Sequence, residues 1–255
     1  MNKMTAKYLA VLDYIRRKRS ATVAEIAAVN FLSESTVRRL LAEMDHEGLV
    51  QRFHGGAVIS GENPEVIRVV QRTAVNIREK AAIAREAASA VQDGMTLLML
   101  GGTSVMAMCP YLRGKNVTVI TNSIPVMNDF TQEEKIKLIL LGGVFNPAEL
   151  EVRGSMTIEG VSRLRADILF TGASYVHPEF GIMTNDPEAV ATYQACIAVA
   201  DRKVLLADST KFRIGGVTAV TDLSKLDRII TDEQLSADTA TNLSRKGIAI
   251  TTVQI

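Results

Sequence analysis

Between residues 79 and 255, short apolar runs alternate with stretches of helical periodicity, and this alternation restricts the fold more than any other feature. The runs are continuously apolar, as expected for strands of a parallel sheet that helices cover on both faces. We expect a helix over 186–201, and strands over 95–100, 117–121, 136–141, 166–171, 204–207, 228–231 and 248–253. The sequence therefore predicts an α/β fold with a parallel sheet in this part of the chain.

The first sixty residues follow a different pattern, which predicts three short helices. Thr22 and Glu25 have the spacing of a capping box, which starts the second of them, and Ser33 is a good N-cap for the third. Apolar residues at helical spacing predict the inward faces of the first and third helices: Tyr8, Val11, Leu12 and Ile15, then Val37, Leu40, Leu41 and Met44.

The opposite side of the third expected helix is polar and basic. Ser35 and Arg39 point away from the apolar face, Arg38 lies on its flank and Thr36 lies near the helix start. Hydroxyl groups can bond phosphates or base edges, and arginine can bind guanine through two hydrogen bonds, so this helix suits the major groove of DNA. The plainer alternative is a helical bundle with a solvated arginine face.

After Gly48, residues 49–57 predict two short strands around a glycine-permitted turn, a wing that carries Arg52 and His54. Those two side chains and Ser33 can contact the phosphate backbone. Residues 1–60 hold nine basic and six acidic residues, whereas the whole chain has a net charge of +1. A modestly basic segment on a near-neutral body is consistent with a DNA-binding head.

This stretch resembles the winged helix-turn-helix of the DeoR family of bacterial transcription regulators. The resemblance rests on the recognition-helix and wing residues Ser33, Thr36, Val37, Arg38, Arg39, Arg52, His54, Gly55, Gly56 and Ala57. Leu40 departs from it, because the family usually has an aspartate there that can brace an arginine. We expect Ser35, Thr36, Arg38 and Arg39 to contact DNA in the groove, and Ser33, Arg52 and His54 to contact phosphate.

In the larger part of the chain, polar residues follow one expected strand after another. Because ligands bind at the carboxyl ends of the strands in such sheets, these residues predict a site for a small, phosphorylated ligand. The set is Gly101, Gly102, Thr103, Ser104, Thr121, Asn122, Ser123, Gly142, Gly143, Asp208, Ser209 and Lys211. Lys211 would offer a charge to phosphate and Asp208 would accept sugar hydroxyls. The glycine loop is neither a Walker A motif nor GxGxxG.

These motifs resemble the DeoR effector domain, which is itself similar to ribose-phosphate isomerases and CoA transferases. In that family the ligand is typically a phosphorylated sugar, which usually weakens operator binding. The chain departs from the pattern in three places: Leu100 stands where the family commonly has an aspartate, Ser174-Tyr175 stands where it has Asp-Gly, and Tyr193 stands where it has a lysine. We therefore expect a site with the anion loop but an altered polar wall.

Together these features predict a winged helix-turn-helix domain over 1–60, a linker over 61–78 and an effector-sensing α/β domain over 79–255. The expected function is a sequence-specific transcription regulator, a repressor of a carbohydrate-utilisation operon controlled by a phosphorylated sugar or related metabolite. The alternative is a sugar-phosphate isomerase-like enzyme. Its partners would be double-stranded operator DNA, the metabolite and further copies of the chain, as a dimer or tetramer.

No metal site or cofactor is expected, since the three histidines are scattered. Cys109 and Cys196 lie in apolar stretches outside any CxxC motif and are expected as buried thiols. No signal pattern or membrane-spanning run is found, so we expect a cytoplasmic protein rather than a membrane or secreted one.

Overall fold

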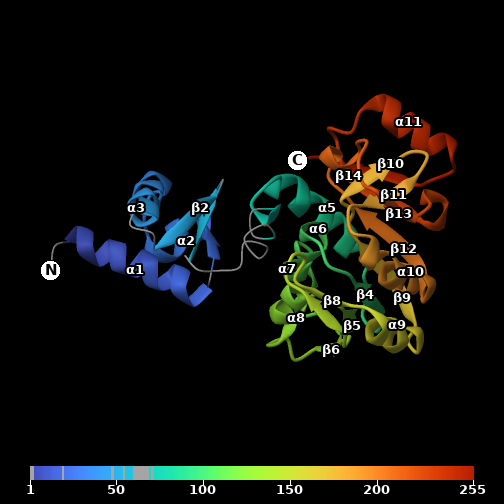
Figure 1. The fold of residues 1–255 in the computed structure, drawn as a ribbon, viewed down its shortest axis with the longest axis horizontal. Helices are drawn as coiled ribbons and strands as arrows, with labels where there is room; N and C mark the ends of the chain where they lie inside the picture. The colour runs from blue at the N-terminus through green and yellow to red at the C-terminus, as the bar shows by residue number, and fades with distance from the viewer. Residues whose placement is uncertain (1–2, 19, 47–48, 54, 60–68, 70–71) are drawn as a thin grey trace. The chain divides into compact units, whose positions relative to one another are not determined.

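The computed structural model describes residues 3–18, 20–46, 49–53, 55–59, 69 and 72–255. The chain forms two compact units, Met1–Val75 and Asn76–Ile255. Each unit is drawn in Figure 1 and is described by itself below. Among the described residues, no helix is both long enough and apolar enough to cross a membrane.

Between residues 3 and 59, the described residues of the first unit form three helices and a small sheet. The helices are α1 (Lys3–Lys18), α2 (Val23–Asn30) and α3 (Glu34–His46). The capping box predicted for α2 is present, because the Thr22 hydroxyl accepts a hydrogen bond from the Glu25 N–H at 3.2 Å and the Glu25 carboxylate accepts one from the Thr22 N–H at 2.7 Å. All four residues expected on the inner face of α3 are buried.

The small sheet contains the wing. Its antiparallel strands lie in the order β1 (Ser20–Thr22), β3 (Gly56–Ile59) and β2 (Val50–Phe53), so the two predicted wing strands are confirmed. Gly56 must be glycine, since a Cβ there would lie 2.4 Å from the Ala21 carbonyl oxygen. The third strand, β1, was not predicted because three residues are too few for an alternation to be recognised.

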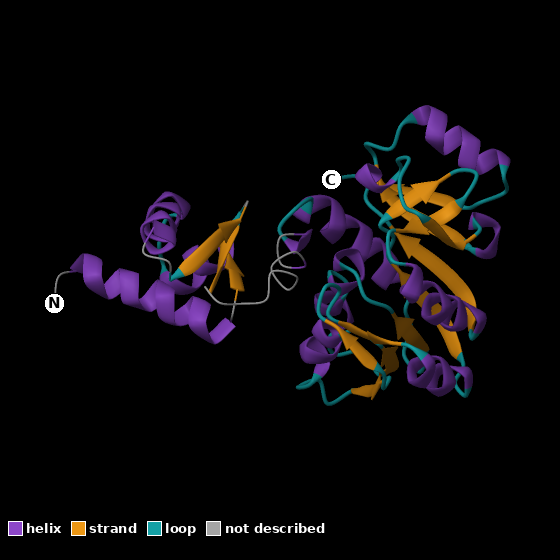
Figure 2. Cartoon of the chain, in the orientation of Figure 1, coloured by secondary structure: helices purple, strands orange, loops and turns teal. Residues whose placement is uncertain are grey.

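The second unit is built on a seven-stranded parallel sheet, as predicted. Its strand order is β15-β14-β12-β9-β4-β5-β6, and Figure 2 shows helices on both sides of it. The strands are β4 (Thr96–Met99), β5 (Val117–Thr121), β6 (Ile136–Leu140), β9 (Ala166–Thr171), β12 (Ala200–Leu206), β14 (Arg228–Asp232) and β15 (Ile250–Val253).

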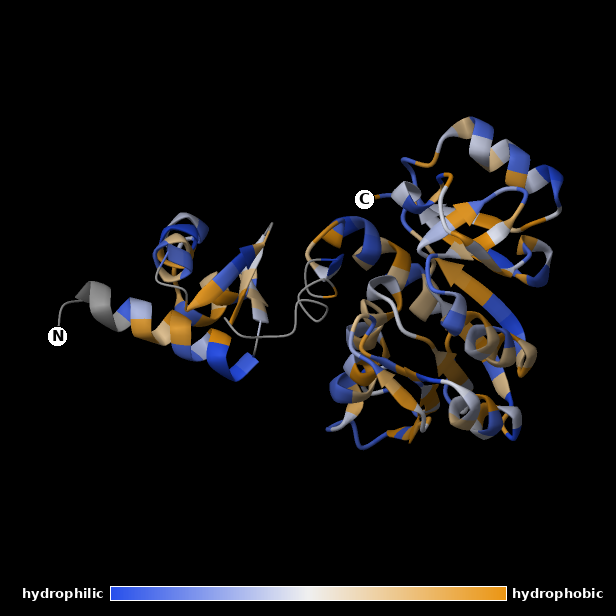
Figure 3. Cartoon of the chain, viewed as in Figure 1, coloured by the Kyte–Doolittle hydropathy of each residue, from blue (hydrophilic) through white to orange (hydrophobic). Residues whose placement is uncertain are grey.

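The two faces of the sheet have separate cores. Leu97 and Met99 of β4 pack on one side with α5 (Ile77–Ser89), α6 (Thr103–Met106), α7 (Cys109–Leu112) and α8 (Ile124–Phe130). Leu98 and Leu100 pack on the other side with α9 (Ser155–Ser162), α10 (Val190–Ala198) and α11 (Ala237–Arg245). Both faces are therefore apolar, which explains the continuous apolar strands in Figure 3.

The helix expected over 186–201 is wrong at both ends. A 3-10 turn, η1 (Pro187–Ala189), precedes α10, and β12 already begins at Ala200. The sheet ends the helix there, because Ala200 pairs with Ala166 of β9 and continues the parallel ladder. An apolar sequence that suits both a buried helix and a buried strand gives no signal at this junction.

Two further pieces of β structure were not predicted. One is the hairpin β7 (Val144–Asn146) and β8 (Glu151–Arg153), and the other is an antiparallel sheet of β10 (Tyr175–His177), β11 (Gly181–Thr184) and β13 (Thr218–Thr221). A single bridge between Ser123 and Glu151 joins the hairpin to the end of β5. The hairpin therefore lies at the carboxyl edge of the main sheet. Short 3-10 turns, η2 (Ser209–Lys211) and η3 (Leu223–Lys225), complete the unit.

Candidate functional sites

The start of α3 presents a cluster of hydroxyl groups. Ser33 caps the helix, with its Oγ 3.3 Å from the Thr36 N, 2.8 Å from the Thr36 Oγ1 and 3.0 Å from the Ser35 Oγ. Ser33 and Ser35 are exposed and Thr36 is half-buried. The three side chains expected to contact DNA thus share one surface at the amino end of the helix.

Arg38 and Arg39 are both exposed on α3. The Arg38 Nη2 lies 2.6 Å from the Glu34 Oε2, one helical turn earlier. Leu40, which stands where an aspartate was expected, is buried in the core of the unit. Arg38 therefore has a carboxylate partner on its own helix, and an exposed pair of this kind is weak enough to be exchanged for a contact with DNA.

The wing carries Arg52 on β2, where its side chain is exposed and its N–H donates to the Asp45 Oδ1 at 3.2 Å. His54 lies outside the described residues. The DNA contacts assigned to these side chains and to those of α3 stay predictions.

In the second unit, the predicted effector residues follow the strands β12, β4, β5 and β6 at one edge of the sheet. Asp208 follows β12, which is two strands away from β4 and the loop at Gly101. Because neighbouring strands lie about 4.8 Å apart, these two strands are close enough to border one site. Gly142 follows β6, two strands away on the other side. The loop at Gly101 is therefore the centre of the predicted site.

Several of these residues hold the chain in place. The Thr121 hydroxyl donates to the Met99 carbonyl at 2.6 Å, and the Ser123 hydroxyl caps α8. A Cβ at Gly143 would lie 2.1 Å from the Thr157 Oγ1, so this glycine permits α9 to approach. The Gly142 carbonyl accepts a hydrogen bond from the same Thr157 hydroxyl at 2.7 Å.

Asp208 is buried and its two oxygens differ. The Oδ1 accepts hydrogen bonds from the Asn76 Nδ2 at 3.0 Å and from the N–H and hydroxyl of Thr210, whereas the Oδ2 has no partner. Ser209 donates its N–H to the Asp232 Oδ2 at 2.7 Å, and Lys211 is half-buried. An unpartnered buried oxygen can accept a hydrogen bond from a ligand.

Glu151 is the residue of this region that the sequence analysis missed. It is 1% exposed, and its Oε2 accepts hydrogen bonds from the Tyr193 Oη at 3.1 Å and the Asn122 Nδ2 at 3.3 Å. A Cβ at Gly101 would lie 2.6 Å from the same oxygen, so the loop's first glycine allows the carboxyl to approach its backbone. No spacing in the sequence indicates this contact; Tyr193 in place of a lysine was the one available signal.

Burial raises the pKa of Glu151 to about 7, and the negative charge of Glu149 adds to the rise. The hydrogen bonds from Tyr193 and Asn122 and the positive charge of Arg153 act in the opposite direction. Burial and the charge of Glu151 raise the pKa of Tyr193 well above its ordinary value, so the phenol stays protonated and donates. A carboxyl with this pKa changes its protonation near neutral pH.

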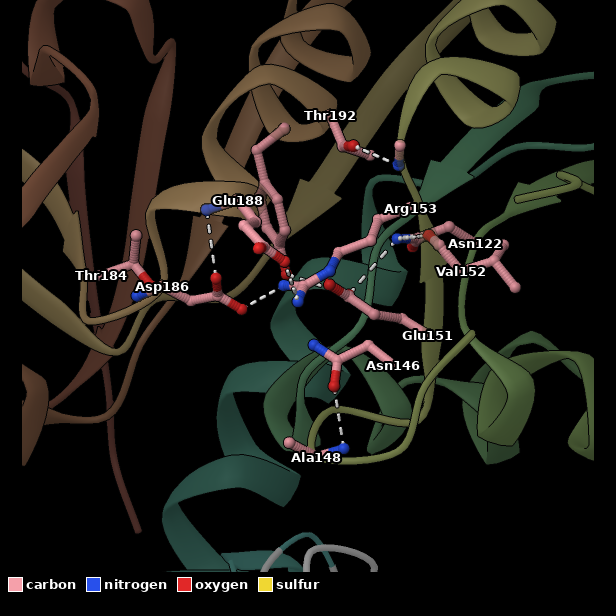
Figure 4. Close-up of polar contacts among 12 residues, drawn as sticks. Asn122, Asn146, Ala148, Glu151, Val152, Arg153, Thr184, Asp186, Glu188 and Thr192 are labelled. Carbon is pink, nitrogen blue, oxygen red and sulfur yellow. Dashed lines mark hydrogen bonds and ion pairs between the residues drawn. The ribbon is translucent and has the colours of Figure 1, made fainter. Parts of the chain in front are cut away.

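Arg153 lies beside Glu151 and its partners Tyr193 and Asn122. Its Nη2 is 3.1 Å from the Glu188 Oε2, and its Nη1 pairs with Asp186. Figure 4 shows the side chains of Glu151, Arg153 and Asn146 converging from β7 and β8, with Asp186 and Glu188 opposite. Arg153 is 16% exposed and Glu188 is 82% exposed, so Glu188 marks the solvent side.

Comparisons with known families match almost the whole chain. Residues 9–62 match the DeoR-like helix-turn-helix domain, and residues 75–233 match the DeoR C terminal sensor domain. The lactose phosphotransferase system repressor of Lactococcus lactis subsp. lactis is 33% identical over 89% of this chain and 90% of its own length. The glycerol-3-phosphate regulon repressor of Escherichia coli (strain K12) is 26% identical over 90% of this chain and 91% of its own.

A putative aga operon transcriptional repressor of Escherichia coli O157:H7 is 25% identical over 94% of this chain and 90% of its own length. Among solved structures, ribose 5-phosphate isomerase A of Methanocaldococcus jannaschii is similar over 54% of this chain and 55% of its own, with 21% identity and a TM-score of 0.40. That likeness is too distant to indicate a shared activity.

Proposed function

The chain belongs to the DeoR family of transcriptional regulators, and from that premise we propose that it represses a carbohydrate-utilisation operon and responds to a phosphorylated sugar. Its relatives are named as repressors of lactose, aga and glycerol-3-phosphate systems, which supports the assignment of carbohydrate genes. We place its action in the cytoplasm, where operator DNA lies.

The observation that carries this proposal is the two-sided character of α3. Its inner face is buried, and its outer face presents Ser33, Ser35, Arg38 and Arg39 together. A helix with hydroxyls at its amino end and arginines one turn later has the chemistry needed to bond phosphates and base edges in the major groove. Arg52 of the wing adds a cation for the neighbouring phosphate backbone.

The effector would bind at the carboxyl edge of the large sheet, around the loop that begins at Gly101. Backbone N–H groups and the hydroxyls of Thr103 and Ser104 would bond the phosphate, and Lys211 would add a positive charge. The unpartnered Oδ2 of Asp208 supports a role in accepting a sugar hydroxyl. Gly142 and Gly143 support the site through packing on α9.

Regulation requires that the effector bind more tightly to the arrangement that does not hold the operator, because a ligand with equal affinity for both states shifts nothing. One head covers few base pairs, so two or more copies would bind half-sites spaced by a whole number of helical turns. We propose the homo-oligomer, a dimer or tetramer, on this ground.

The test is footprinting of the full-length protein on promoters from its own genome, with and without a panel of sugar phosphates. A protected site that one of these compounds releases is the expected result. Protection that no sugar phosphate changes would refute the effector assignment, and failure to protect any promoter would refute the repressor assignment.

A sugar-phosphate isomerase is the second candidate, and the buried Glu151 is the observation that favours it. A carboxyl with a pKa near 7 suits a general base, but isomerisation also needs an acid placed at the sugar carbons. The Glu151 Oε2 is already held by Tyr193 and Asn122, which supports a binding role. Turnover of ribose 5-phosphate by the purified protein would establish the enzyme instead.

A further inference from the structure

One buried acceptor near the loop of Gly101, the side-chain oxygen of Asn122, lacks a hydrogen-bond donor. The Asn122 Nδ2 donates to the Val152 carbonyl at 3.1 Å and to Glu151 at 3.3 Å, so both partners of the amide nitrogen are acceptors. This fixes which way the amide points and leaves its Oδ1, fully buried, without any partner. The neighbouring carboxyl of Glu151 is also an acceptor when ionised.

The charged groups around Glu151 also favour a ligand that donates hydrogen bonds and carries a positive charge. The carboxylate of Glu149 acts on it from the preceding turn, and Arg153 beside it is paired with Asp186, which caps η1, and with Glu188 of η1. The side chains that face it from α10 are Tyr193 and Cys196, which are neutral. Arg153 is the single cation among these named groups, and it is already shared by Asp186 and Glu188.

From these acceptors and carboxylates we propose that Glu151 and the Asn122 Oδ1 bind an ammonium group of the effector, which is therefore an amino-bearing sugar phosphate. This inference rests on the proposed function and names the ligand class of the same site. An ammonium group supplies three hydrogen-bond donors and a positive charge. A hydroxyl in its place supplies one donor and no charge. Glu151 and the Asn122 Oδ1 would receive two of these donors.

The arrangement also separates the two ends of such a ligand. Glu151 stands against Gly101, so a phosphate bound at that glycine would face a carboxylate. Thr103 and Ser104 are the first residues of α6, and Lys211 follows β12, which lies on the side of β4 opposite to β5. The phosphate end therefore belongs toward Thr103 and Ser104 and the amino end toward Glu151.

The same argument explains why Tyr193 stands where the family resemblance implies a lysine. A lysine there would place an ammonium of the protein itself against Glu151 and occupy its carboxylate. Tyrosine donates one hydrogen bond, at 3.1 Å, and leaves the negative charge for a ligand.

The test measures binding of two matched pairs by calorimetry at pH 7.5: glucosamine 6-phosphate against glucose 6-phosphate, and galactosamine 6-phosphate against galactose 6-phosphate. The members of each pair differ only in an amino or hydroxyl group. For at least one pair we expect the amino compound to bind at least tenfold more tightly. Equal binding, or tighter binding of the hydroxyl compound in both pairs, would overturn the inference and leave the proposed function standing.

Glu151→Gln is the first variant, since glutamine keeps the shape and the oxygen acceptor but removes the charge. We expect the amino preference to fall to about one, whereas a general disturbance of the site would weaken both members of a pair equally. Tyr193→Lys is the second variant. It should abolish the preference for the amino compound because the lysine ammonium would itself bind the Glu151 carboxylate. Circular dichroism checks that both variants fold.

A preference that persists in Glu151→Gln would overturn the assignment of the ammonium to this carboxyl. Failure of all four compounds to bind the wild-type protein would overturn this inference, whereas the sugar-phosphate effector itself is refuted only if no compound of the footprinting panel changes protection. The two failures are therefore distinguishable.

Discussion

Replacing Glu151 with glutamine removes a buried carboxyl whose pKa is raised from 4.5 to about 7, mainly by burial. Between these two pH values the folded protein keeps a proton that the unfolded chain has lost. The free energy of unfolding therefore falls as the pH rises through this range and levels off above about 7. At 1.36 kcal/mol per pH unit, the loss amounts to about 3 kcal/mol.

Glutamine does not titrate, so the free energy of unfolding of Glu151→Gln should not show this fall as the pH rises. We expect the variant to gain up to about 3 kcal/mol over the wild type between pH 4.5 and pH 8. Scanning calorimetry of the full-length protein at several pH values measures it, from the transition of the unit that contains residue 151.

Glu159→Gln is the matched control, because Glu159 is exposed and forms a surface pair with Arg163 at 2.7 Å. This variant should follow the wild-type pH profile. A stability difference between Glu151→Gln and the wild type that is the same at pH 4.5 and pH 8 would refute the argument, since it would show that Glu151 titrates alike in the folded and unfolded chains.

Three other substitutions or treatments have expected outcomes. Arg38→Ala should weaken operator binding by about 1–3 kcal/mol in a mobility-shift titration if Arg38 contacts a base; an equal loss on every DNA would show a phosphate contact instead. Gly143→Ala should lower the stability of the large unit by about 1–3 kcal/mol in thermal melts, because the new Cβ would lie 2.1 Å from the Thr157 Oγ1. Burial raises the pKa of Cys109 well above its ordinary range and that of Cys196 to about 12, so iodoacetamide at pH 7.5 should leave both unmodified until the protein is unfolded.

The main sheet could be predicted because its signal is local. Each strand is a continuous apolar run, and a run that is apolar on both sides of the pleat requires covering layers on both faces. The error over 186–201 has the opposite cause. Whether Ala200 continues a helix or starts a strand depends on Ala166, its partner in the ladder, and that pairing cannot be seen in the local sequence.

The recognition helix could be predicted for a similar reason. The cap at Ser33 and the buried face of α3 are set by spacings within one turn or two, so burial there follows directly from the pattern. The Glu34–Arg38 pair has the same local origin and could have been inferred from its i, i+4 spacing. Glu34 thus supplies on the same helix the carboxylate that position 40 lacks.

The effector site is harder to predict, because its parts come together only through the hairpin of β7 and β8. Leu100 lacks the carboxylate that the family resemblance implies, and the structure turns its side chain into the core beneath the sheet. Glu151 brings a carboxyl to the next residue, Gly101, from a strand fifty residues away in the sequence. We infer that the site has a carboxylate on a different element, and that Tyr193 adds no positive charge beside it. The departures at Leu100 and Tyr193 then have one physical consequence, which is that the carboxylate beside the loop of Gly101 belongs to Glu151 and has no lysine next to it at position 193. The paired sugar phosphates test this property.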